Sequence, residues 1–208
     1  MSTTDRWGTF DCYGTLIDWN GGLRRALGSD ELLERYHELE PEVEAEHPDW
    51  SYRDVMTEAS RRLGVEDQSA LARSLPSWEP HPEVRAALEE TRARGWKLAI
   101  LSNTDRDFIE ASIERIGVPF ELAIVASEVG SYKPAHGHWE RFFAEVDVPR
   151  DRHVHVAQSH FHDVVPASEL GLTSVWINRY GERYELPPTR ELPDLNRLAD
   201  TLDELVPA

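Results

Sequence analysis

The feature that most constrains the fold is a regular alternation of strand and helix patterns, which begins near Pro82 and continues to the C-terminus. Residues 97–101 form an apolar run typical of a strand buried on both faces. Strands are expected at 96–101, 122–126, 153–157 and 174–177, and helices at 82–94, 106–116, after Pro134, at 161–170 and at 195–206. Because helical crossovers join parallel strands, the alternation predicts an α/β fold with a doubly wound parallel sheet.

The first 80 residues follow a different pattern. A short β-prone run at 7–10 is followed, from about Gly21 to Leu75, by helical patterns alone. Ser29 or Asp30 can cap a helix that is expected to end or kink near Pro41, and Ser51 can cap a second. The pattern therefore predicts a core made of residues 1–18 and 81–208, with an all-helical unit, residues 19–80, inserted after the first strand.

Composition narrows the function classes. The 208 residues carry a net charge of −17, which disfavours nucleic acid and anionic membranes as partners. No apolar run reaches the roughly 20 residues of a membrane span. One cysteine and an N-terminus unlike a signal peptide predict a cytoplasmic protein. Scarce lysine and excess acid fit either a high-salt habitat or a GC-rich genome.

Polar residues follow the predicted strands at their carboxyl ends. Phe10 ends the first strand, and Asp11 and a Gly-Thr turn come next, where free backbone N–H groups are expected. Alone, Asp11 also fits a turn cap, Ser102 a helix cap, Lys133 a solvated charge and Asp163 a helix start. Because parallel strands bring these positions to one edge of the sheet, their order together predicts an active site.

The segment from Phe10 to Asp18, with the later positions in order, resembles the haloacid dehalogenase superfamily. The motif Asp-x-Tyr-Gly-Thr-Leu-x-Asp is most similar to that of its L-2-haloacid dehalogenase branch. Phosphatases of the superfamily carry an acid at the position of Tyr13 to protonate a leaving alcohol, which a leaving halide does not need. The resemblance implies a Rossmann-like core under a helical cap, and hydrolysis of short 2-haloacids through an aspartyl ester. It implies no cofactor and allows a homodimer. The alternatives are a Mg²⁺-dependent phosphatase and a non-catalytic protein of the same fold.

The resemblance also implies roles for single residues. Asp11 would be the nucleophile, with Thr15 and Lys133 holding its oxygens, and Arg35 would bind the leaving halide. The alternative for Arg35 is a surface pair with Glu31 or Glu38. Substrate contacts are assigned to Cys12, Tyr13, Ser102, Asn103, Tyr36, Leu39 and Trp139. The Cys12 side chain is nevertheless expected to point into the core, and core packing is the alternative for each apolar wall residue.

The last loop departs from the family pattern. Gln158 stands where phosphatases have a further acid for Mg²⁺, which weakens a metal site. Dehalogenases have an asparagine near His160, so the hydrolytic water needs another partner. We expect His160 to act as general base, oriented by Asp18, with Asp163 as the alternative base. A solvent-facing His160 is the remaining alternative. The other histidine pairs lack zinc-ligand spacing, and no metal site is predicted.

Overall fold

A parallel six-stranded sheet forms the core of the computed structural model, which describes residues 5–184 and 186–208. The strand order is β3-β2-β1-β4-β5-β6, and each neighbouring pair is parallel. The strands are β1 (Arg6–Phe10), β2 (Trp96–Ser102), β3 (Leu122–Val125), β4 (His153–Ala157), β5 (Thr173–Ile177) and β6 (Arg190–Leu192). The predicted α/β fold is confirmed. Strand β6 was not predicted from the sequence, since its three residues, two exposed and one partly buried, give no apolar run.

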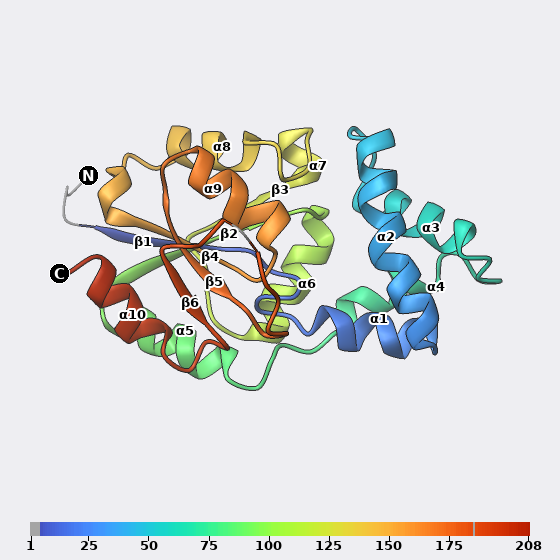
Figure 1. The fold of residues 1–208 in the computed structure, drawn as a ribbon, viewed down its shortest axis with the longest axis horizontal. Helices are drawn as coiled ribbons and strands as arrows, with labels where there is room; N and C mark the ends of the chain where they lie inside the picture. Colours follow the sequence, from blue (N-terminus) through green and yellow to red (C-terminus); the bar gives the residue numbers. More distant parts are fainter. Residues whose placement is uncertain (1–4, 185) are drawn as a thin grey trace.

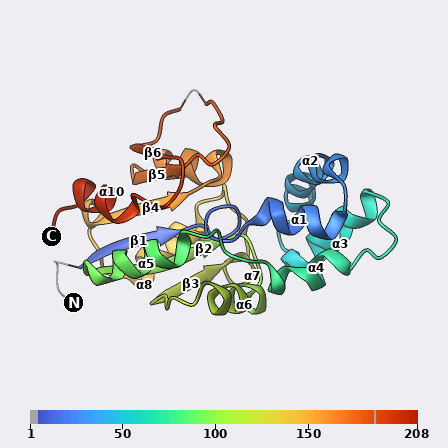
Figure 2. The same cartoon turned by 90° about the horizontal axis from the view of Figure 1, so that it is seen from below.

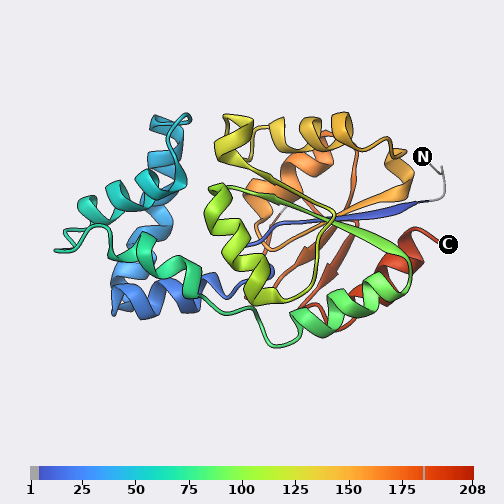
Figure 3. The same cartoon turned by 180° about the vertical axis from the view of Figure 1, so that it is seen from behind.

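Helices cover both faces of this sheet (Figures 1 and 3). Successive strand residues point to opposite faces, so Leu98 and Ile100 join one apolar cluster while Ala99 and Leu101 join the other. The first face carries α5 (Val84–Ala93), α6 (Arg106–Ile116) and α10 (Leu198–Leu205). The second carries α8 (Gly137–Glu145) and α9 (Val165–Glu169), and α7 (Ala126–Val129) follows β3. The core is therefore doubly wound, as predicted.

The helical unit lies beyond the carboxyl ends of the strands, and the start of β1 and the C-terminus lie at the opposite end (Figures 1 and 2). Its helices are α1 (Trp19–Leu27), α2 (Asp30–Glu46), α3 (Tyr52–Arg62) and α4 (Ala70–Ser74), followed by a 3₁₀ turn, Leu75–Ser77. Ser29 and Ser51 cap α2 and α3 with their hydroxyls, as expected. No helix in the described ranges has the length and hydropathy needed to cross a bilayer.

Helix α2 does not end at Pro41 but continues to Glu46, contrary to one of the two expectations for this proline. Proline removes one backbone donor, and buried residues on both sides of it hold the helix against its neighbours. Tyr36 and Val43 are fully buried on either side of the proline. Tertiary packing therefore outweighs the local cost.

The chain enters and leaves the helical unit along one short bridge. Asp18 N donates to Glu79 O at 2.9 Å, and His81 N donates to Leu16 O at 2.9 Å. Ile17 and Pro80 pair between these bonds. We propose on this basis the division into a core of 1–18 and 81–208 and a cap of 19–80.

Gly22 of α1 lies directly against Trp78, where the chain returns from the cap. A Cβ built on Gly22 would lie 2.2 Å from Cδ2 of the buried indole. We expect Gly22→Ala to lower the free energy of unfolding by about 1–3 kcal/mol, since the rigid ring must shift. Thermal unfolding measures this loss, with the exposed Arg25→Ala on the same helix as control. Equal melting temperatures of the two variants would contradict the close packing.

Candidate active site

A cavity of about 340 Å³ lies between the carboxyl ends of the strands and the cap. Its core side is formed by the loops after β1, β2 and β4, by Lys133 of the loop before α8, and by residues 180–184 after β5. Its cap side is formed by α1, α2 and the start of α3. The site residues predicted from strand ends therefore meet at one edge of the sheet, where a substrate can be enclosed.

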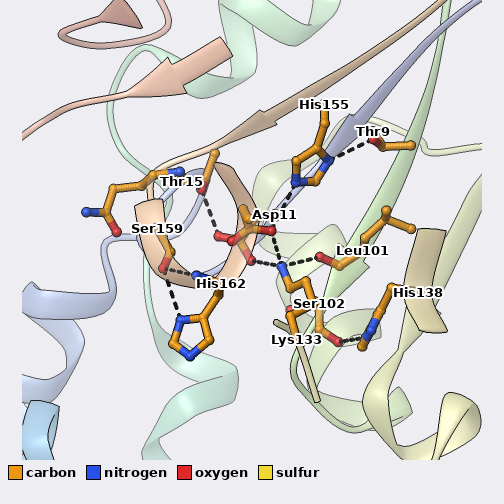
Figure 4. Close-up of polar contacts among 12 residues, drawn as sticks. Thr9, Asp11, Thr15, Leu101, Ser102, Lys133, His138, His155, Ser159 and His162 are labelled. Atoms are coloured by element: carbon orange, nitrogen blue, oxygen red, sulfur yellow. Dashed lines mark hydrogen bonds and ion pairs between the residues drawn. The ribbon is translucent and has the colours of Figure 1, made fainter. Parts of the chain in front are cut away.

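Asp11 is fixed through both carboxylate oxygens (Figure 4). Oδ2 accepts a 2.7 Å hydrogen bond from Thr15 Oγ1, and Oδ1 accepts a 3.0 Å bond from Lys133 Nζ. Thr15 is held in turn, because its oxygen accepts from the backbone N–H of Gln158 at 2.8 Å. The turn between Asp11 and Thr15 requires positive φ at Gly14, which is +89°. This arrangement orients the carboxylate without neutralising it.

Lys133 is the central cation of the site. Its ammonium is 1% exposed and donates to Asp11, to Asp163 Oδ1 at 2.6 Å and to Leu101 O at 2.9 Å. Burial alone would lower the pKa of Lys133, but the two carboxylates raise it overall. An ammonium has three protons, so every one of them is used.

The two carboxylates that share Lys133 differ in basicity. Burial raises the pKa of Asp11 above its usual value, against the opposing effect of the Lys133 ammonium. Burial acts in the same direction on Asp163, but there the ammonium and a hydrogen bond from His155 prevail and lower the pKa to about 2. Asp11 is therefore the more basic carboxylate and the better nucleophile of the two.

Ser102 is the last residue of β2 and Asn103 follows it, and both line the cavity. The Ser102 hydroxyl is buried and makes no hydrogen bond to the residues that the structure describes. Asn103 bonds the backbone of Lys133 twice, accepting from its N–H at 2.7 Å and donating to its C=O at 2.9 Å. Ser102 is thus free to bind a ligand, whereas Asn103 fixes the loop that carries the lysine.

His160 lies in the cavity wall, but Asp18 does not orient it. The Asp18 carboxylate caps α1 by accepting from Gly21 N at 2.9 Å. His160 is 4% exposed, donates from Nε2 to Leu186 O at 2.7 Å and stacks on the ring of Tyr184. The expected link between the two residues is therefore wrong, because the first helix needs the aspartate at its N-terminus. The alternative of a solvent-facing His160 is wrong as well.

Arg35 is exposed on α2 and does not line the cavity, contrary to its expected role. The residues of α2 that do line it are His37, Glu40, Pro41 and Glu44. Two residues along a helix turn the side chain by roughly 200°, so Arg35 and His37 point to nearly opposite sides. The described residues that line the cavity thus include no arginine.

Four further expected substrate contacts lie outside the cavity lining, while Tyr13 is part of it. Cys12 is fully buried beneath the site, as its side-chain direction suggested. Tyr36 is part of the large apolar cluster that extends from the cap into the first face of the sheet, and Leu39 packs against it. Trp139 lies on α8 against the second face of the sheet, with its ring 5.2 Å from that of His155. Assigning these residues to the cavity was wrong because each one completes a core.

Two acidic residues of α2 that line the cavity were not predicted from the sequence as site residues. Glu40 and Glu44 are 8% and 5% exposed and line the cavity opposite Asp11. Tyr52 donates a 2.8 Å hydrogen bond to Glu40 Oε1. Burial nevertheless raises the pKa of Glu40 to about 7. Its place in the apolar stripe, four residues after Tyr36, was the available signal that it would be buried.

Other cavity residues gave no signal in the sequence. Trp19 and Asn20 of α1 and Tyr180, Glu182 and Tyr184 after β5 complete the lining. Their positions depend on how the cap and the chain after β5 are placed relative to the strand ends, most of which are far away in the sequence. Local patterns do not encode such long-range placement.

Comparison with known proteins agrees with this geometry. The family model for haloacid dehalogenase-like hydrolases matches residues 9–171. An (S)-2-haloacid dehalogenase, H-109, from Pseudomonas putida is 25% identical over 93% of this chain and 96% of its own. Another, from Pseudomonas sp. strain YL, is 28% identical over 85% and 84%. The L-2-haloacid dehalogenase of Xanthobacter autotrophicus with chloropropionic acid covalently bound superposes with a TM-score of 0.83, at 19% identity, over 95% of this chain and 98% of that one. The match over most of the chain makes this protein a member of the haloacid dehalogenase-like hydrolase family.

Proposed function

We propose that this protein is an L-2-haloacid dehalogenase, which converts short 2-haloacids to 2-hydroxy acids and halide. The observation that carries the proposal is the Asp11 carboxylate, oriented by Thr15 and Lys133 in the cavity between the core and the cap. Tyr13, two residues later, is a weaker acid than the aspartate that a leaving alcohol needs, since burial raises the pKa of its phenol. The relatives named as (S)-2-haloacid dehalogenases support the same reaction.

In the first step an oxygen of Asp11 attacks C2 of the substrate from the side opposite the halogen. A C–O bond forms, the C–halogen bond breaks, and halide leaves with the electron pair. The buried, singly oriented carboxylate lowers the entropic cost of this geometry. Configuration at C2 inverts once, so an L-substrate gives a D-hydroxy acid.

In the second step water attacks the carbonyl carbon of the Asp11 ester. Lys133 and Thr15, which already bond the two carboxylate oxygens, stabilise the negative charge that develops there. The acyl C–O bond then breaks, and the 2-hydroxy acid leaves with a proton. Asp11 is regenerated with one oxygen from water.

Two groups are candidates to take the proton from that water, and we assign the role to Asp163. It bonds the same ammonium as Asp11, and its Oδ2 is buried without a hydrogen-bond partner among the described residues. The Nε2–H of His160 is donated to Leu186 O, which leaves Nδ1 as the acceptor, but the ring is stacked on Tyr184 and makes no hydrogen bond to Lys133 or Asp11 in the described structure. Asp163 therefore has the free acceptor next to the ester.

Substrate binding follows from the free donors of the cavity. The Ser102 hydroxyl is suited to the substrate carboxylate, because it is buried and unpaired in the described structure. With Arg35 outside the cavity, neutral groups of the cap wall are left for the halide, and the side-chain N–H of Asn20, whose oxygen accepts from His37 Nε2 at 3.0 Å, is a candidate. Neutral N–H donors in a dry pocket can stabilise a departing anion.

The proposal predicts chloride and D-lactate from L-2-chloropropionate, at a rate that EDTA does not change. Asp11→Ala should lower turnover by at least about 1,000-fold, since no nucleophile remains. Chloride release and chiral analysis of the product measure this, and Asp151→Ala, an exposed aspartate before β4, is the control. In ¹⁸O-labelled water, Asp11 should acquire the label over many turnovers. Mg²⁺-dependent phosphate release from phosphate esters, without chloride release from haloacids, would contradict the proposal.

Glu40 should make activity toward an anionic haloacid depend on pH. Its pKa of about 7 means that it is neutral below pH 7 and a carboxylate above, where it repels the substrate. We therefore expect kcat/KM of the wild type to fall as pH rises from 6 to 8.5, and Glu40→Gln to reduce that fall several-fold. Exposed Glu42→Gln on the same helix should leave the fall unchanged. An identical pH profile for Glu40→Gln would exclude this role.

A further inference from the structure

A line of buried polar side chains leads from the active site into the sheet (Figure 4). His155 of β4 is fully buried, and its Nε2 lies 3.0 Å from Asp163 Oδ1. Its Nδ1 lies 2.8 Å from the hydroxyl of Thr9 on β1, which lies 2.8 Å from Nε2 of His153. Strand pairing creates the line, because Thr9 and His155 are register partners of adjacent strands. None of these three side chains is part of the cavity lining.

The direction of each hydrogen bond follows from the acceptor at its end. Asp163 is ionised and can only accept, so His155 donates from Nε2; with a single ring proton, its Nδ1 is an acceptor. Thr9 donates to that nitrogen and accepts from His153. Burial lowers the pKa of His153 to about 3, so its ring is neutral. The tautomer of His155 with its proton on Nε2 is therefore compatible with all three hydrogen bonds of the line.

This line determines which oxygen of Asp163 is free. Oδ1 accepts from both His155 and Lys133, whereas Oδ2 is buried and has no partner among the described residues. The ammonium of Lys133 cannot bond Oδ2 as well, because its three protons are used. A buried carboxylate oxygen without a partner costs free energy, and a water in the cavity that Asp163 lines would relieve it.

We propose that His155 is a positioning residue, which holds Asp163 with Oδ2 directed at the water that hydrolyses the Asp11 ester. The inference rests on the function proposed above. As the water oxygen bonds to Cγ of Asp11, its proton becomes strongly acidic and passes to Oδ2 of Asp163. The acyl C–O bond breaks, and the departing alkoxide oxygen takes the proton from Asp163. Lys133 alone would leave the carboxylate free to rotate about its single contact, so the second donor is what fixes its plane.

The role predicts that loss of His155 slows ester hydrolysis more than ester formation. In His155→Leu, the first turnover should release chloride within about threefold of the wild-type rate, while steady-state turnover falls by about 10–100-fold. His155→Gln keeps an N–H that can reach Asp163, so it should recover most of the loss. Rapid-quench measurement of chloride from L-2-chloropropionate, with mass analysis of the Asp11 peptide, should show the ester accumulating in His155→Leu only.

A second variant tests the inference if His155→Leu does not fold. Thr9→Val removes the donor to His155 Nδ1, and Thr9 makes no hydrogen bond to Asp163 in the described structure. Ester hydrolysis should again slow more than ester formation, by a smaller factor than in His155→Leu. Thr173→Val, a partly buried strand threonine of β5, is the matched control and should behave as wild type. The inference would be overturned if first-turnover chloride release and steady-state turnover fell by the same factor. It would also be overturned if the Asp11 ester accumulated in neither His155→Leu nor Thr9→Val. Absence of chloride release from the wild type would overturn the proposed function itself, and the inference with it.

Discussion

The buried ammonium of Lys133 is the interaction on which the site depends. It lies between two carboxylates that could not both stay ionised in the interior without it. Removing one partner from such a buried group costs about 3–5 kcal/mol, because the other charges stay unpaired. The surrounding structure serves to hold the lysine. Leu101 O at the end of β2 accepts its third proton, and Asn103 fixes its backbone from both sides.

Sharing one cation gives the two aspartates different chemistry. Asp163 receives a second donor, His155, and Asp11 receives the weaker hydroxyl of Thr15. The carboxylate with two strong donors has its pKa lowered, and the other keeps its basicity. The same geometry therefore makes Asp11 the more basic of the two carboxylates, as a nucleophile requires.

The sequence predicted the parts of the site that follow strand ends, and it failed for the parts that depend on helix rotation. Asp11, Ser102, Lys133 and Asp163 come together because parallel strands place their carboxyl ends at one edge. The side of α2 that faces the cavity, by contrast, is set by contacts with α1 and α3, which no local pattern specifies. The resemblance assigned Arg35 inward, although one feature pointed elsewhere: Glu40 shares the buried stripe of Leu33, Tyr36 and Val43. The same reasoning accounts for β6, whose three residues pair with β5 only through long-range placement.

Trp139 illustrates how a residue outside the cavity can still affect the reaction. It packs against the second face of the sheet, with the edge of its ring against His155 and its neighbours in an apolar cluster. His155 in turn reaches Asp163 across the sheet edge. The fully buried imidazole is held by this ring contact and by its hydrogen bonds to Thr9 and Asp163. In the proposed mechanism, the core beneath the site thus contributes to the position of Asp163.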